Sequence, residues 1–219
     1  MECSGVLRSF FLFLAAFLLS TGAALAQGTC PADPVTITLH TFAGEPEIDN
    51  EKPPEEVRAL ATALRQSGRL IGLYVGNVNA SALPTYEIVR VGDVLCVRTS
   101  EVSVALTIEA RKIYVTNDRL PGTCEYREVL EHERQHQAID DALLKEYGPI
   151  FEEAVVQAVA RVGSDPVPLG RRVDAQRRLS QAMERALRQA FARLAAERNR
   201  RQMALDTQAE YLRIANACK

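Results

Sequence analysis

Residues Cys124–Tyr147 read CEYREVLEHERQHQAIDDALLKEY, and the rest of the chain is interpreted outward from this stretch. Its apolar residues recur at roughly helical spacing, and no Gly or Pro interrupts before Gly148, so the pattern predicts a helix. His132 and His136 are four residues apart and therefore share one face, where both imidazoles can bind a single ion. Glu133 lies beside them, placed to take a proton from a metal-bound water.

The pattern H-E-x-x-H is short, and a solvated helix whose histidines face water is the alternative to a zinc site. The chain contains three histidines, and two of them occupy these positions. We therefore expect His132 and His136 to bind zinc. The remaining histidine, His40, lies near the end of a short alternating segment, where we expect a surface or core residue and no ligand.

Residues 1–26 have the features of a secretory signal peptide. Arg8 precedes the apolar run Phe10–Leu19, and Ala24-Leu25-Ala26 supplies the small residues of a cleavage site. A retained membrane anchor is the alternative, but the apolar run is short for a bilayer span, and no later segment is long enough. We expect cleavage after Ala26 and export of the mature chain to a bacterial periplasm or beyond.

Four cysteines follow the predicted cleavage site: Cys30, Cys96, Cys124 and Cys218. An even number in an exported chain predicts two disulfides, with three possible pairings. We expect Cys96–Cys124, joining a strand to the start of the motif helix, and Cys30–Cys218, joining the two ends. A cysteine metal site is disfavoured because no two cysteines have C-x-x-C spacing.

The N-terminal half predicts an α+β fold over residues 27–165. A strand at Val35–Thr41 and a helix from Pro54 to about Gln66 precede a region of period-two patterning between Leu70 and Asn117. Short connections between sequential strands favour a curled antiparallel sheet. The expected strands are Leu70–Val78, Tyr86–Val91, Val94–Arg98, Val102–Glu109 and Lys112–Thr116. The last of these is expected either to line a cleft and pair with an extended peptide, or to be an ordinary interior strand.

The C-terminal half predicts long helices. A helix after Gly148-Pro149 is expected to reach about Val162, and residues 166–219 are expected to form a helical extension that packs back on the core. The extension carries an apolar stripe and is rich in arginine on its other faces. Its arginines are Arg171, Arg172, Arg177, Arg178, Arg185, Arg188, Arg193, Arg198, Arg200 and Arg201.

Two interpretations of these arginines stay open. They form either a solvated face or an electropositive surface for an anionic partner. Nucleic acid is disfavoured, because export separates the chain from it and aromatic side chains for base stacking are lacking. The formal net charge of −2 carries little information about partners.

A catalytic zinc site needs a third protein ligand beside the two histidines. Asp140 continues their helical face, but eight residues of helix rise about 12 Å, which is too far from His132 for a shared ion. The third ligand must therefore come from another element.

The motif helix, with a Cys shortly before it, resembles the zincin metallopeptidases, and in particular small secreted bacterial zinc proteases. The resemblance covers Cys124–Tyr147 and, more loosely, a layout in which a β-rich half precedes the motif and long helices follow it. It implies a zincin-like fold, Zn²⁺ as the cofactor and a peptide or protein substrate. The extended pattern His-Glu-x-x-His-x-x-Gly-x-x-His is not present, since Ile139 and Ala142 occupy its last two fixed positions.

In the branch of zincins with a glutamate ligand, a downstream Glu binds the metal and a nearby Asp orients one histidine. The usual order, with the Asp three or four residues after the Glu, is not present at a standard distance; instead Asp206 lies four residues before Glu210. By this resemblance we expect Glu210 as the third ligand and Asp206 as the partner of a histidine. Glu152 or Glu153 are the alternatives. Tyr147 and Tyr211 are candidates for donors to an oxyanion, with buried packing as their other possible role.

These expectations describe an exported zinc-dependent peptidase in which Glu133 is the general base. The alternative is a non-catalytic exported binding or scaffold protein with a degenerate or structural motif, whose arginine face docks a partner or the cell envelope. Stoichiometric zinc would separate the two, because the binding protein does not require metal.

Overall fold

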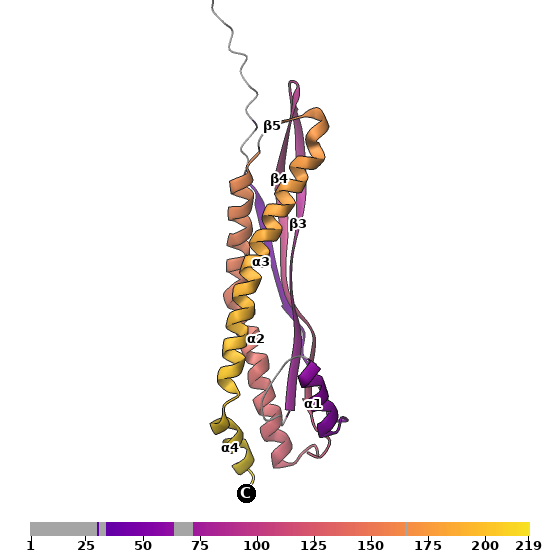
Figure 1. Ribbon diagram of the computed structural model, residues 1–219, viewed down its shortest axis with the longest axis vertical. Helices are drawn as coiled ribbons and strands as arrows, with labels where there is room; N and C mark the ends of the chain where they lie inside the picture. The colour runs from indigo at the N-terminus through magenta and orange to yellow at the C-terminus, as the bar shows by residue number, and fades with distance from the viewer. Residues whose placement is uncertain (1–29, 31–33, 64–71, 165) are drawn as a thin grey trace, which may run out of the picture.

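The computed structural model describes residues 30, 34–63, 72–164 and 166–219. The predicted signal peptide, residues 1–26, lies outside the described residues, as do the predicted end of the first helix at Gln66 and the predicted strand start at Leu70. The described chain is α+β, with an elongated sheet and long helices packed along it (Figure 1). Among the described residues, no helix is both long and apolar enough to span a bilayer.

A long antiparallel hairpin forms the centre of the sheet. Strand β3, Gly72–Val91, pairs along its length with β4, Val94–Val115. The prediction of five shorter strands over this region is wrong, because only the turn at Gly92, with φ of 60°, separates strands. Pro84 is accommodated because β3 is an edge strand, where a missing N–H breaks no ladder. Ala110, with φ of 49°, lies in the β-bulge where the register between β3 and β4 shifts.

The opposite edge of β4 pairs with three short strands, β1 (Thr36–Ala43), β2 (Glu47–Asp49) and β5 (Pro166–Pro168). Strands β1 and β2 run parallel to β4, whereas β5 runs antiparallel, so the expected wholly antiparallel sheet is wrong. The segment Lys112–Val115 lies between β3 and β2 and is interior. The expectation of a cleft edge at Lys112–Thr116 is therefore wrong. Strand β3 pairs only with β4 among the described strands, so its other edge is free.

The helices are α1 (Pro54–Ala63), α2 (Cys124–Val162), the 3-10 turn η1 (Leu169–Arg171), α3 (Arg172–Leu205) and α4 (Gln208–Asn216). Helix α2 continues through Gly148 and Pro149, where two helices were expected. Glycine allows close packing there, since a Cβ at position 148 would lie 3.1 Å from Leu39 and 3.2 Å from Thr41 on β1.

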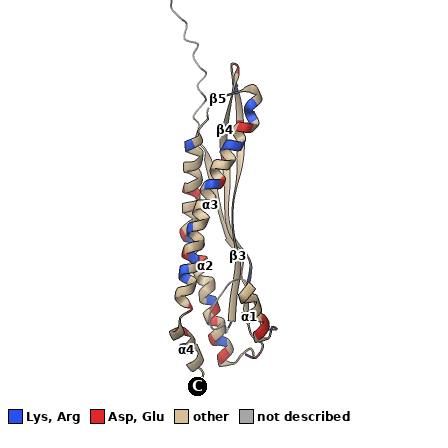
Figure 2. Cartoon of the chain, viewed as in Figure 1, with Lys and Arg blue, Asp and Glu red and all other residues tan. Residues whose placement is uncertain are grey.

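The main core lies between one face of the sheet and the helices α2 and α3. Val102, Val104 and Leu106 of β4 meet Phe151 and Val155 of α2, and all five are completely buried. The predicted apolar stripe of α3 is confirmed by its buried residues Leu179, Met183, Leu187, Ala190 and Leu194. Basic residues recur along α3, with acidic residues between them, as Figure 2 shows.

Two disulfides are present, as expected for an exported chain, but both predicted pairings are wrong. Cys30 bonds to Cys96, and Cys124 bonds to Cys218. Cys96 lies near the hairpin turn, and the strand continues for another 19 residues to Val115 before α2 begins. At about 3.3 Å per residue, these 19 residues of strand are roughly 60 Å long and carry the chain away from Cys96 before it reaches Cys124.

We expect Leu106→Ala to lower the free energy of unfolding by about 2–5 kcal/mol, because it removes a completely buried side chain from the central strand. Leu83→Ala is the matched control, since Leu83 of β3 is 75% exposed and its loss should change stability by less than about 0.5 kcal/mol. Denaturant titration with both disulfides intact measures each difference. Equal losses would contradict the packing described.

Candidate metal centre

The motif lies on the N-terminal part of α2, as predicted, and it is buried. His132 is 1% exposed, Glu133 3% and His136 7%. The alternative of a solvated helix face is therefore wrong. Strand β3 covers one side of the motif, and the end of α3 with the start of α4 covers the other.

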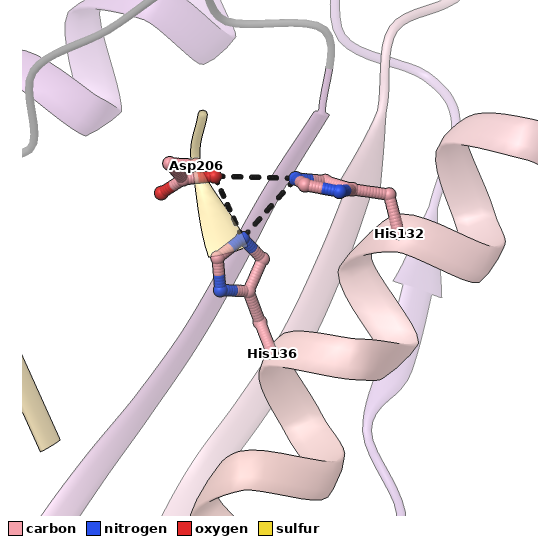
Figure 3. A group of neighbouring side chains, drawn as sticks. All are labelled: His132, His136 and Asp206. Atoms are coloured by element: carbon pink, nitrogen blue, oxygen red, sulfur yellow. Dashed lines mark hydrogen bonds and ion pairs between the residues drawn. The ribbon is translucent and has the colours of Figure 1, made fainter. Parts of the chain in front are cut away.

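The third group comes from the break between α3 and α4. Asp206 ends α3 in a non-helical conformation, with φ of −77° and ψ of 59°, and α4 restarts at Gln208. This places Asp206 Oδ1 at 3.2 Å from His132 Nε2 and 3.0 Å from His136 Nε2 (Figure 3). The two Nε2 atoms are themselves 3.2 Å apart.

The three atoms thus form a nearly equilateral triangle with the spacing of metal ligands. Around a tetrahedral ion with bonds near 2.0–2.1 Å, neighbouring ligand atoms are separated by about 3.3 Å. Burial opposes ionisation of Asp206, but its hydrogen bonds with His132 and His136 outweigh it and hold the pKa of Asp206 well below its usual range. The carboxylate is therefore charged at neutral pH.

The hydrogen bonds of Gln202 define how the ring of His136 is protonated. The Gln202 amide donates through Nε2 to Asp140 Oδ1 (3.1 Å) and to the His136 carbonyl (3.1 Å). Its Oε1 therefore accepts from His136 Nδ1. With a proton on Nδ1, the neutral ring can offer the lone pair of Nε2 to a cation, in place of the hydrogen bond that a protonated Nε2 donates to Asp206.

His132 has a comparable arrangement. Its buried Nδ1 has no hydrogen-bond partner among the described residues, and the nearest acidic oxygen is Glu210 Oε1 at 3.6 Å. A carboxylate favours a proton on the nitrogen that faces it, which again leaves Nε2 with a lone pair. When both Nε2 atoms are unprotonated, three electron-pair donors point at one place, an arrangement that a cation satisfies. The group His132, His136 and Asp206 could therefore hold a metal ion.

The positions of Asp206 and Glu210 around the histidines are the reverse of those expected from the sequence. Glu210 was the predicted ligand and Asp206 the predicted partner of a histidine; the structure places the Asp206 carboxylate between the two Nε2 atoms and Glu210 against Nδ1 of His132. The reason is the break between α3 and α4, because residues 206 and 210 would share a face only on one continuous helix. Glu210 is also held by Arg213, at 2.8 and 2.9 Å.

Glu133 points toward the edge strand β3. Burial raises the pKa of Glu133 to about 7, although the neighbouring His136 and His132 oppose this rise, as does a hydrogen bond from the Tyr74 backbone N–H. An ideal Cβ built at Gly72 would lie 2.6 Å from Glu133 Oε1, so the strand approaches the carboxylate closely. A side chain with a pKa near neutrality can exchange protons readily at physiological pH.

Asp140 is completely buried and lies under the site. It accepts from Arg198 at 2.7 and 2.9 Å, from the Tyr74 hydroxyl at 3.0 Å and from Gln202. Sequence reasoning excluded Asp140 as a ligand but placed Arg198 on the exposed arginine face and missed Gln202. The available signal was spacing, because Arg198, Gln202 and Asp206 follow one another at intervals of four.

A cleft of about 720 Å³ opens over the site between β3 and α3. Tyr211 lines it and donates its hydroxyl to Asp206 Oδ1 at 3.2 Å. The other predicted residues lie elsewhere. Tyr147 donates to the Arg193 carbonyl at 3.4 Å, and Glu152 and Glu153 are at least 16 residues beyond His136 on α2, or about 24 Å of helix. His40 is exposed on β1.

Comparison of the chain with models of protein families, with curated proteins and with solved structures finds no match. The zincin-like fold therefore stays a prediction.

We expect Gly72→Ala to destabilise the protein by about 1–3 kcal/mol, as overpacking in a filled interior does. The added methyl would lie 2.6 Å from Glu133 Oε1 and 2.7 Å from Val129 Cγ1. Gly170→Ala is the control, because a Cβ at position 170 has nothing within 4 Å. Thermal unfolding of both variants measures the difference, and an unchanged Gly72→Ala variant would contradict the close approach of β3 to Glu133.

Proposed function

We propose that the protein is an exported zinc-dependent peptidase, with His132, His136 and Asp206 as the metal ligands and Glu133 as the general base. The observation that carries this proposal is the triangle of electron-pair donors with sides of 3.0–3.2 Å. The buried carboxylate of Glu133 lies beside it, and a cleft leads to it. Nitrogen and carboxylate ligands suit zinc, and two histidines with one carboxylate form a known type of catalytic site.

When bound, zinc would lower the pKa of a water molecule and polarise the carbonyl of the substrate. Glu133 then has the task of moving a proton. Its carboxylate accepts the proton of the attacking water and returns it to the nitrogen of the leaving amine. The pKa of about 7 that burial gives Glu133 suits both transfers.

The free edge of β3 supports a peptide as the substrate. Asn77, Val78 and Asn79 line the cleft, and no strand among the described residues pairs with this edge. An extended peptide can add to such an edge through main-chain hydrogen bonds, which bind a backbone with little regard to its sequence. Tyr211 is a candidate donor to the substrate oxygen. Burial and the nearby Asp206 raise its pKa, so its hydroxyl keeps its proton.

Zinc binding tests the assignment of the third ligand. We expect the wild type to bind one zinc ion per chain and Asp206→Asn to lose the most affinity. Glu210→Gln should lose less, about 10- to 100-fold, because Glu210 only orients His132. Asp174→Asn, at the far end of the helix that Asp206 terminates, serves as the control. Competition against a chromophoric chelator measures all three, and a larger loss in Glu210→Gln than in Asp206→Asn would restore Glu210 as the ligand.

Hydrolysis tests the role of Glu133. Glu133→Gln should retain zinc but lower kcat/KM on an unfolded protein substrate, such as labelled casein, by about 10²–10⁴-fold, because the amide cannot accept the proton. Glu131→Gln, an exposed residue two positions earlier, should leave the rate unchanged. Zinc binding without any hydrolysis in the wild type would favour the non-catalytic binding protein.

A further inference from the structure

Residues 206–216 bring three groups to the site but are weakly attached to the rest of the protein. Asp206 faces the histidines, Glu210 faces Nδ1 of His132, and Tyr211 donates to Asp206. Helix α4 is nine residues long. Of its residues, all of which the structure describes, Ile214 alone is buried. A helix this short is not stable in water without tertiary support.

Beside the contact of Glu210 with His132, three links hold α4 in place. Ile214 belongs to a cluster of buried side chains with Val129 of α2 and with Tyr74, Ile113 and Val115 of the sheet, and Tyr126 and Leu130 pack against this cluster. Arg213 pairs with Glu128 at 2.8 Å, but both side chains are partly exposed, and such pairs contribute little. The remaining link is the disulfide between Cys124, the first residue of α2, and Cys218, two residues beyond α4.

We propose that the Cys124–Cys218 disulfide is a redox lock on the metal centre, an inference that rests on the proposed zinc site. With the disulfide closed, α4 stays docked and keeps Glu210 and Tyr211 in place. With the disulfide open, the short helix detaches, His132 loses the carboxylate that orients it, and Asp206 loses its hydroxyl partner. Loss of such supporting contacts weakens metal binding by about 10- to 100-fold.

Opening the lock requires a dithiol reductant. Cys124 and Cys218 are both partly exposed to solvent, where such a reductant can reach them. A thiolate of the reductant attacks one sulfur and forms a mixed disulfide, and its second thiolate then displaces the protein thiol. Two electrons and two protons pass to Cys124 and Cys218, and the reductant becomes a disulfide. The site therefore reaches full zinc affinity only where this pair is oxidised.

The second disulfide provides a matched control within the same chain. Cys30–Cys96 joins the start of the described chain to β4 beside β5. Cys96 is separated by 17 residues of β4 from Ile113, which packs with Val129 near the motif; that stretch of strand is roughly 56 Å long. Neither Cys30 nor Cys96 contacts α4.

The experiment measures the affinity for zinc alone, by competition with a chromophoric chelator, for the full chain after export. Its variants are Cys124→Ser with Cys218→Ser and, as the control, Cys30→Ser with Cys96→Ser. The first pair should bind zinc about 10- to 100-fold more weakly than the wild type, and the control pair should bind as the wild type does. Backbone hydrogen exchange should become faster in α4, residues 208–216, and stay unchanged in α2 and α3.

Each other outcome is decisive. Equal affinity in the two double variants overturns the lock and leaves the proposed function standing, whereas a wild type without zinc binding overturns the proposed function itself. If Cys124→Ser with Cys218→Ser loses helical circular dichroism well beyond what α4 contributes, the disulfide supports the whole fold, and the lock is rejected.

Discussion

The completely buried carboxylate of Asp140 is the constraint on which the site depends. A charge without access to water is tolerated only when it is paired and hydrogen-bonded. Its partners come from two other elements, Arg198 and Gln202 from α3 and Tyr74 from β3. Satisfying this one carboxylate therefore fixes the positions of the motif helix, the edge strand and the long C-terminal helix relative to one another. Arg111 extends the network, because it donates to the Tyr74 hydroxyl and pairs with Asp141.

The candidate metal centre follows from that arrangement. With α3 held by Arg198, the next turn brings Gln202 to His136, and the turn after that ends at Asp206. Three residues at intervals of four therefore build the site from one side: Arg198 pairs with Asp140, Gln202 orients His136, and Asp206 supplies the third candidate ligand. The two histidines are aligned by α2 itself, and the position of Glu133 depends on the close approach of Gly72. Each of the three elements supplies something that the other two cannot.

Local pattern was sufficient for some of this structure and insufficient for the rest. The helix around His132 and His136 could be predicted because its periodicity and its histidine spacing are local properties. The disulfide pairing could not, because it depended on β4 being one strand of 22 residues, which separates Cys96 from Cys124. The exchange between Asp206 and Glu210 depended on a helix break of two residues. The parallel pairing of β1 with β4 is likewise a choice among distant partners that no local pattern encodes.

The cleft walls have a consequence for access. Strand β3 is continuous from Gly72 to Val91 and helix α3 from Arg172 to Leu205, and side chains join them at two places. The Tyr86 hydroxyl meets Gln176 and Ser180 near the hairpin turn, and Arg198 meets the Gly76 carbonyl beside the site. These contacts tie the two cleft walls to each other within the described chain. For the proposed peptidase, a cleft with walls tied in this way would admit a polypeptide as an unfolded thread, and a compact domain would have to lose its structure locally before one of its bonds reached Glu133.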